Sequence, residues 1–197
     1  MAKEGQSGGL DAIAGEVRRA GKQGPLPVHL WNPPFCGDID MRIATDGTWY
    51  YLGTPIGRPA LVKLFASVLK REDDKYFLVT PVEKVGIVVE DAPFLAVEMK
   101  TEQTPDGPAL HFRTNVDDWV RCGSEHRLRF EPEAGTGGLK PYLYVRRDLW
   151  AKVTRALFYE LVERGEEREV DGETMFGVAS AGVFFAMARA DSLKDLM

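Results

Sequence analysis

Residues 39–52 read IDMRIATDGTWYYL, and this stretch decides how the first part of the chain folds. Apolar and polar residues alternate over residues 39–43, which is typical of a strand with one buried face. The pair Asp46-Gly47 then separates this run from an aromatic run, and such a pair between two strand-like runs is a strong signal of a β-hairpin. A helix is expected from about Pro59, because proline is tolerated in the first turn of a helix.

The same order of elements recurs later in the chain. Residues 127–145 form a second candidate hairpin around a glycine-rich loop, and an amphipathic helix is expected over residues 147–163. We therefore predict an α+β fold of two similar sheet-plus-helix units, a duplicated core in which hairpin 39–52 and helix 58–71 superpose on hairpin 127–145 and helix 147–163. The predicted parts are a tail with a short helix (residues 1–27), an N-terminal unit (residues 28–82) and a C-terminal unit (residues 83–197).

The composition is that of an ordinary globular protein. Of the 197 residues, 44% are hydrophobic and 28% are charged, so disorder of the whole chain is not expected. The net charge of −5 argues against general binding of nucleic acid polymers, which requires a basic surface. The most apolar stretch, residues 174–188, is shorter than the roughly 20 residues of a membrane-spanning helix. Cys36 and Cys122 are expected to be buried free thiols, and these features together predict a cytoplasmic protein without a membrane span.

No motif in the sequence marks an enzyme. The glycine-rich residues 135–140 lack the spacing of a nucleotide-binding P-loop and lead into a strand rather than a helix. Cys122 and His126 lie near each other in sequence, but no paired ligands complete a metal site, so neither a metal nor a cofactor is expected. A small hydrolase or transferase that uses Cys122, His126 or Asp117 stays open as an alternative, although the sequence identifies no third group that would orient the base.

The charge distribution indicates one basic surface. Residues 109–155 contain nine Lys or Arg and six Asp or Glu, a local balance of +3 in a chain of net charge −5. Strand alternation places Arg113 and Asn115 on the polar face of one predicted strand, and Arg127 and Arg129 on the polar face of another. If these strands pair, the side chains form one surface that suits a phosphate, because guanidinium groups bind oxyanions through paired hydrogen bonds. The alternative is a solvated face whose arginines pair with nearby carboxylates.

Five segments of the chain read CGDIDMRI (36–43), DGTWYY (46–51), GTPIGR (53–58), FRTNV (112–116) and PYLYVR (141–146). They resemble a bacterial family known as domain of unknown function 1285, over about residues 28–187. The resemblance implies a duplicated core and a C-terminal unit similar to pleckstrin-homology-like folds. It also implies a nucleotide-like ligand in a cleft between the two units and a signalling role. It carries no established activity, so it assigns no catalytic residue.

The leading hypothesis is a non-enzymatic ligand-binding or signalling module that holds a nucleotide-like or other anionic small molecule between its two units. The candidate contacts in the N-terminal unit are Arg42, Arg58 and Trp49, in addition to the arginine-bearing surface of the C-terminal unit. Trp49 is expected to be partly buried, near the junction of the units. The alternatives are the hydrolase or transferase named above and a protein-binding adaptor that takes no small ligand; the sequence identifies no protein partner.

Overall fold

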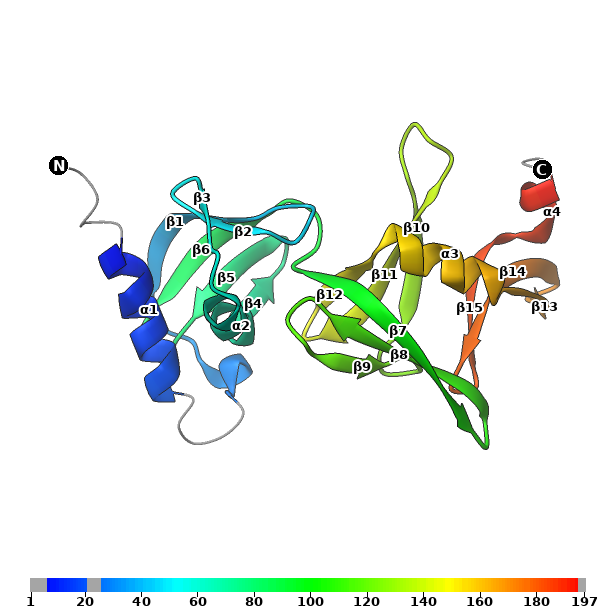
Figure 1. Ribbon diagram of the computed structural model, residues 1–197, viewed down its shortest axis with the longest axis horizontal. Helices are drawn as coiled ribbons and strands as arrows, with labels where there is room; N and C mark the ends of the chain where they lie inside the picture. The colour runs from blue at the N-terminus through cyan, green and yellow to red at the C-terminus, as the bar shows by residue number, and fades with distance from the viewer. Residues whose placement is uncertain (1–6, 21–25, 195–197) are drawn as a thin grey trace. The chain divides into compact units, whose positions relative to one another are not determined.

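The computed structural model describes residues 7–20 and 26–194, and the chain divides into two compact units, Met1–Pro93 and Phe94–Met197 (Figure 1). The predicted α+β class with two similar sheet-plus-helix units is confirmed. The boundary expected after residue 82 lies too early in the chain, because residues 84–89 form a strand inside the N-terminal sheet. Val85 and Ile87 on that strand are buried, so the strand belongs to the core of the first unit.

The N-terminal unit is built on a six-stranded sheet of order β3-β2-β1-β6-β5-β4. The predicted hairpin is confirmed, since β1 and β2 pair antiparallel on either side of the Asp46-Gly47 turn. Strands β1 and β6 lie parallel, and the remaining neighbours are antiparallel. The elements in chain order are α1 (Ser7–Ala20), η2 (Val28–Leu30), β1 (Phe35–Ile43), β2 (Trp49–Tyr51), β3 (Thr54–Pro55), α2 (Pro59–Ser67), β4 (Leu69–Glu72), β5 (Lys75–Val79) and β6 (Lys84–Val89).

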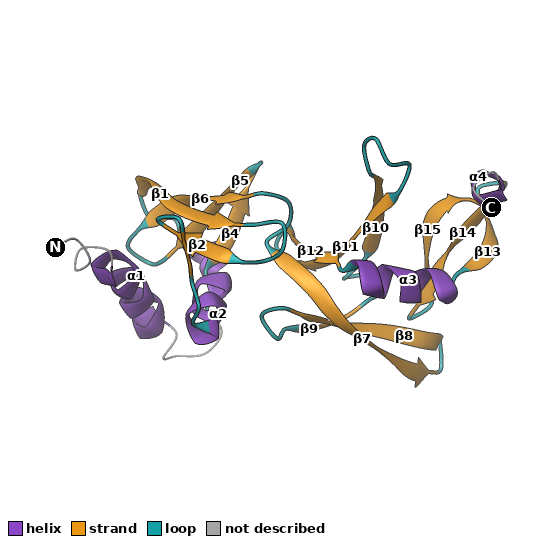
Figure 2. Ribbon diagram, turned by 45° about the horizontal axis from the view of Figure 1, so that its top comes forward, coloured by secondary structure: helices purple, strands orange, loops and turns teal. Residues whose placement is uncertain are grey.

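The C-terminal unit carries a second six-stranded sheet, of order β10-β11-β12-β7-β8-β9, and a separate three-stranded sheet, of order β13-β14-β15. Helix α3 follows the six-stranded sheet and contacts both β7 and β14 (Figure 2). The elements are β7 (Phe94–Thr104), β8 (Gly107–Thr114), β9 (Trp119–Arg121), β10 (Leu128–Pro132), β11 (Leu139–Arg146), β12 (Leu149–Val153), α3 (Arg155–Glu163), β13 (Glu166–Val170), β14 (Glu173–Ser180), β15 (Val183–Arg189) and α4 (Ala190–Lys194).

The two six-stranded sheets share one topology. In each, two three-stranded meanders lie side by side, and the first strand of one meander is parallel to the last strand of the other: β1 with β6, and β7 with β12. The helices occupy different places in this scheme, because α2 lies between β3 and β4 whereas α3 follows β12. By topology, the counterpart of hairpin β1–β2 is therefore β7–β8 rather than the predicted hairpin of residues 127–145.

The helix predicted over residues 147–163 is wrong in its first half, where residues 149–153 form β12. Arg147 and Asp148 have φ of 45° and 62°, which is incompatible with a right-handed helix and typical of a tight hairpin turn. Four of the five residues of β12 are buried, and so short an apolar run is compatible with a strand or a buried helix, so the sequence alone did not separate the two. Likewise helix α2 begins at Pro59 as predicted but ends at Ser67, before strand β4.

Gly177 on β14 lies so close to the neighbouring strand that a side chain there would meet backbone atoms. A Cβ atom there would lie 2.2 Å from the carbonyl oxygen of Phe185 and 2.9 Å from the Cα of Ala186, both on the paired strand β15. We expect Gly177→Ala to lower the free energy of unfolding by about 1–3 kcal/mol, because backbone atoms must move to admit the methyl group.

Urea unfolding followed by circular dichroism measures this effect, with Gly57→Ala as the control. Gly57 is exposed, and a Cβ atom there meets nothing within 4 Å. Equal stability of the two variants would contradict the tight approach of β14 to β15.

Candidate functional site

The arginine-bearing surface predicted from the sequence does not form on adjacent strands. Arg113 lies on β8, while Arg129 lies on β10 and Arg127 directly precedes it. Strands β11, β12 and β7 separate β10 from β8 in the sheet. The prediction that these three arginines project from neighbouring strands is therefore wrong, because each of the two strands pairs with its own hairpin partners instead.

Arg113 lies between two carboxylates. Its Nε donates to Glu98 Oε2 at 2.7 Å and its Nη1 donates to Asp117 Oδ1 at 2.8 Å. Hydrogen bonds from Arg113, and next from Lys100, hold the pKa of the Glu98 carboxyl below its usual value. This is the solvated, carboxylate-paired arrangement that the sequence left open as the alternative, and it occupies donors of Arg113 that an anion would need.

Asn115 makes two hydrogen bonds to the backbone of β7. Its backbone N donates to the carbonyl oxygen of Leu95 at 2.8 Å, and its side-chain Oδ1 accepts from the backbone N of Leu95 at 3.0 Å. The two bonds tie the end of β8 to the beginning of β7.

The Arg113 contacts lead to a pH-dependent prediction. In Arg113→Met we expect the pKa of Glu98 to rise towards its ordinary value, because the largest cause of its depression is removed. NMR measures this pKa from the chemical shift of the Glu98 carboxyl carbon as a function of pH. Lys100→Met should raise the pKa less, since Lys100 is the second cause; an unchanged pKa in Arg113→Met would contradict the ion pair.

The candidate residues of the N-terminal unit do not gather into a site within that unit. Arg42 pairs with Glu90 and lies 4.3 Å from the centre of the Tyr50 ring, and an Nη atom of Arg58 lies 3.6 Å from Asp11. Each arginine therefore already has a local carboxylate partner. The expectation that they face a ligand shared with the other unit stays a prediction.

Trp49 is a core residue. It is 1% exposed, where partial burial was expected, and its ring stacks on Phe65 with 6.4 Å between the ring centres. The hairpin directs this indole beneath helix α2, so a ligand on the surface of the unit has no access to it.

Cys122 is unsuited to the role of nucleophile. Its side chain is fully buried, and burial raises the pKa of the thiol to about 12, so the reactive thiolate is not formed near neutral pH. His126 Nδ1 lies 3.2 Å from the carbonyl oxygen of Tyr144, which can only accept, so this nitrogen carries the proton.

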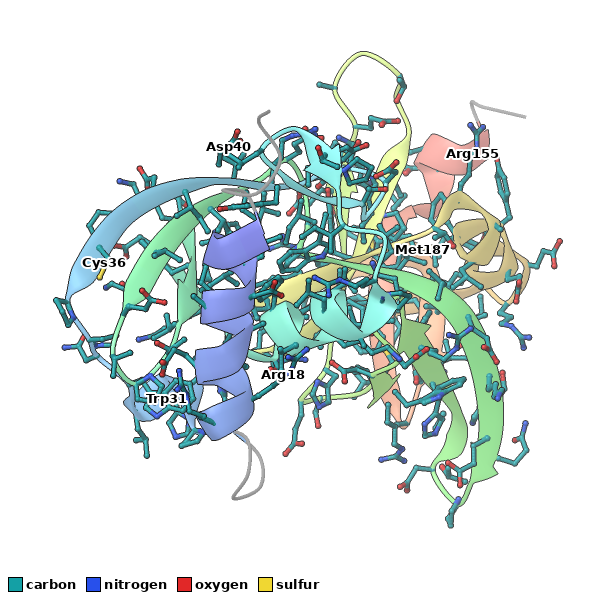
Figure 3. The ribbon with its side chains drawn as sticks, turned by 60° about the vertical axis from the view of Figure 1, so that its left-hand side comes forward. Arg18, Trp31, Cys36, Asp40, Arg155 and Met187 are labelled. Atoms are coloured by element: carbon teal, nitrogen blue, oxygen red, sulfur yellow. The ribbon has the colours of Figure 1, made fainter. Side chains whose placement is uncertain are left out.

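The prediction that Cys36 is buried is wrong, because this residue is exposed on β1 (Figure 3). Both thiols are free.

Alkylation tests this difference between the two thiols. Treatment of the folded protein with iodoacetamide at pH 8 should modify Cys36 and leave Cys122 unmodified, because Cys122 is buried and stays protonated well above this pH. Peptide mass spectrometry measures the modification of each cysteine. The control is treatment of the chain unfolded in about 8 M urea, where both cysteines should react. Modification of folded Cys122 at the rate of Cys36 would contradict its burial.

Asp117 and His126 line a pocket of about 760 Å³ at the turns that flank β9. The charged side chains in its lining are three carboxylates and two arginines, and Arg146 Nη1 already pairs with Asp118 Oδ2 at 2.6 Å. This lining does not favour an anion.

Across residues 7–20 and 26–194, no group of three His, Cys, Asp or Glu side chains is arranged to hold a metal ion.

A second pocket, of about 450 Å³, has the opposite charge balance, and we call it the basic pocket. Three cations and one carboxylate line it, together with apolar and aromatic side chains on the other walls. The lining residues are Glu133, Thr136, Gly138, Leu139, Lys140, Pro141, Lys152, Val153, Arg155, Phe158 and Tyr159.

Three consecutive elements supply the cations of the basic pocket. Lys140 comes from β11, Lys152 from β12 and Arg155 from the first residue of α3. Arg155 is exposed (Figure 3), and its Nε donates to the Tyr159 hydroxyl at 2.9 Å. Lys140 Nζ lies 4.0 Å from Glu133, at the limit of an ion pair.

The glycine-rich loop forms one rim of the basic pocket. Thr136 Oγ1 donates to Glu133 Oε2 at 2.9 Å, and the backbone N of Gly138 donates to Thr136 Oγ1 at 3.1 Å. The backbone N of Glu133 also donates to the carbonyl oxygen of Gly138 at 2.8 Å, which closes the loop. The loop is thus a hairpin turn, as predicted, but it lies beside three cations that the sequence analysis did not bring together.

The fold and the site define a two-unit α+β protein with a basic pocket in its C-terminal unit. Family models match both units: residues 26–92 match "Domain of unknown function (DUF1285), N-terminal domain" and residues 93–187 match "Protein of unknown function (DUF1285), C-terminal domain". The chain belongs to the DUF1285 family, as its sequence segments predicted.

Two crystal structures of DUF1285 family proteins are similar to the chain. One, from Silicibacter pomeroyi DSS-3, has 47% identity and a TM-score of 0.82, and the match covers 92% of this chain and 97% of that one. The other, from Shewanella baltica OS155, has 35% identity and a TM-score of 0.51, with 64% and 91% covered. No curated protein matches the chain. Within the part that the structure describes, no helix has the length and apolar character needed to cross a membrane.

Proposed function

We propose that the chain is a non-enzymatic ligand-binding module with a signalling role, and that its C-terminal unit holds a small, nucleotide-like anion in the basic pocket. The observation that supports this most directly is the convergence of Lys140, Lys152 and Arg155 on one cavity that contains a single carboxylate. Hydrogen bonds between such cations and a phosphate are shorter and roughly twice as strong as those between neutral groups.

The size and the walls of the basic pocket favour a ligand larger than a phosphate ion. Its volume of about 450 Å³ is within the range of roughly 300–1,000 Å³ that is usual for small-molecule sites. Phe158 and Tyr159 line the pocket beside the cations, and Tyr159 is 52% exposed. An aromatic wall next to a cationic one suits a molecule with a planar group and a phosphate, because rings stack on the former and oxyanions bind the latter.

The proposal concerns the C-terminal unit alone. Arg42 and Arg58 stay contacts predicted from the sequence, and binding in the basic pocket does not depend on them. A cytoplasmic location stays a prediction of the sequence, and a protein-binding adaptor without a small ligand is the outcome that a negative experiment would favour.

Isothermal titration calorimetry with adenosine, adenosine monophosphate and inorganic phosphate tests the proposal. We expect saturable binding of the monophosphate, weaker binding of phosphate and no binding of adenosine. Affinity for the monophosphate should fall when the salt concentration is raised, because the contacts are electrostatic. Arg168→Gln, which removes a surface cation from β13, should leave the affinity unchanged. Absence of saturable binding by any anion would overturn the proposal in favour of the adaptor.

A further inference from the structure

Two arginines extend the positive charge of the basic pocket across the neighbouring strands. In the antiparallel pairs, Arg129 of β10 lies opposite Tyr142 of β11, and Tyr142 lies opposite Lys152 of β12. Side chains directly opposite each other in a sheet project from the same face. Arg129 and Lys152 therefore flank one tyrosine on one face, about 10 Å apart at the backbone, since strands are spaced by roughly 4.8 Å.

The two arginines lie over aromatic rings on this face, at distances typical of cation–π contacts. The guanidinium carbon of Arg129 lies 4.0 Å from the centre of the Trp150 ring and 5.2 Å from that of Tyr142. The guanidinium carbon of Arg127 lies 5.7 Å from the Trp150 ring. Trp150 and Tyr142 are each only 5% exposed, so the face that a ligand meets is formed by the guanidinium groups and not by the rings.

A guanidinium group that lies over an aromatic ring can still donate hydrogen bonds to oxyanions from the N–H groups at its edge. Planar stacking occupies the π face of the group, whereas its N–H donors project from the edge in a fixed fork that matches phosphate oxygens. Arg129 Nε lies 3.1 Å from Glu131 Oε1. Arg127 and Arg129 form what we call the arginine row, and Lys152 belongs both to the basic pocket and to the face that carries this row.

We infer that the basic pocket and the arginine row together bind a chain of several linked phosphates, as in a nucleoside triphosphate or an inorganic oligophosphate. This inference rests on the proposed function, because the first phosphate occupies the basic pocket. One phosphate group has four oxygens, fewer than the five cations of the basic pocket and the arginine row, which project from strands spread over about 10 Å. A phosphate chain bridges them, with the later phosphates on the arginine row.

The test compares inorganic phosphate, pyrophosphate and tripolyphosphate by calorimetry on the full chain, at two salt concentrations. In the wild type we expect affinity to rise by about tenfold or more from phosphate to tripolyphosphate. Arg129→Gln should remove most of this rise while phosphate affinity stays within about twofold, whereas Arg155→Gln should lower the affinity for all three ligands.

Adenosine triphosphate and tripolyphosphate are then compared. Tighter binding of the nucleotide identifies the nucleoside triphosphate as the ligand, and equal binding identifies the inorganic chain.

Arg168→Gln is a matched control for Arg129→Gln. Arg168 also stacks on an aromatic ring, 5.1 Å from the centre of Phe184, and also pairs with a carboxylate, Glu166, but it lies on β13 away from the basic pocket lining. An equal loss of tripolyphosphate affinity in both variants would attribute the effect to net charge and overturn the inference.

Equal affinities for the three phosphates in the wild type would overturn the inference of a phosphate chain while the proposed function stands. No binding of any of the three would overturn both. Arg127→Gln serves in place of Arg129→Gln if the latter lowers the unfolding temperature.

Discussion

Replacement of Phe112 by alanine is expected to lower the free energy of unfolding by about 3–5 kcal/mol. Phe112 is fully buried on β8, where it lies opposite Met99 of β7 and Val120 of β9. Its removal withdraws apolar contacts from both neighbouring strands and leaves a cavity that the paired strands cannot close. Urea unfolding followed by circular dichroism measures the loss.

Trp119→Ala is the control for this change, since Trp119 lies on the adjacent strand β9 but is 45% exposed. A larger side chain is removed there, yet the expected loss is smaller because less of it is withdrawn from water. A loss in Phe112→Ala no greater than that in Trp119→Ala would contradict the burial of Phe112 and the register of β7, β8 and β9.

The second large effect concerns the basic pocket. The double variant Lys152→Gln/Arg155→Gln is expected to bind adenosine monophosphate roughly 100-fold more weakly than the wild type, because two of the three cations are removed. The expected loss of affinity is smaller than for buried charges, because both side chains are partly or fully exposed to solvent. Calorimetry measures the affinities, and thermal unfolding of the variant confirms that it is folded.

A matched control separates this local effect from net charge. Arg121→Gln/Arg168→Gln removes the same total charge from the same unit, at residues outside the basic pocket, and should change the affinity by less than about threefold. Similar losses in the two double variants would show that the anion is attracted by overall charge and not held by the pocket.

Local signals in the sequence were sufficient for the first hairpin and the start of the following helix. Asp46-Gly47 and Pro59 act through their own backbone preferences, so their effects do not depend on distant residues. The pairing of distant strands has no such signal. Arg113 and Arg129 share the same alternation, but only the strand order shows that three strands lie between them.

The basic pocket was missed for a related reason. Lys140 and Lys152 line one pocket because β11 and β12 form a hairpin, whereas the helix predicted over residues 147–163 included Lys152. The available signal was Arg147-Asp148 between two apolar runs, where an aspartate in a two-residue turn is compatible with positive φ. Had the turn been recognised, Arg155 would have followed as the first residue of the helix, near both lysines.

The most direct test of the central claim is a titration of the isotope-labelled chain with adenosine monophosphate, followed by the backbone amide chemical shifts. We expect saturable shifts that are largest around the basic pocket, at Gly138, Lys140, Lys152 and Arg155. Largest shifts in the other pocket, around Asp118 and His126, would contradict the assignment of the site, and the absence of saturable shifts would contradict anion binding itself.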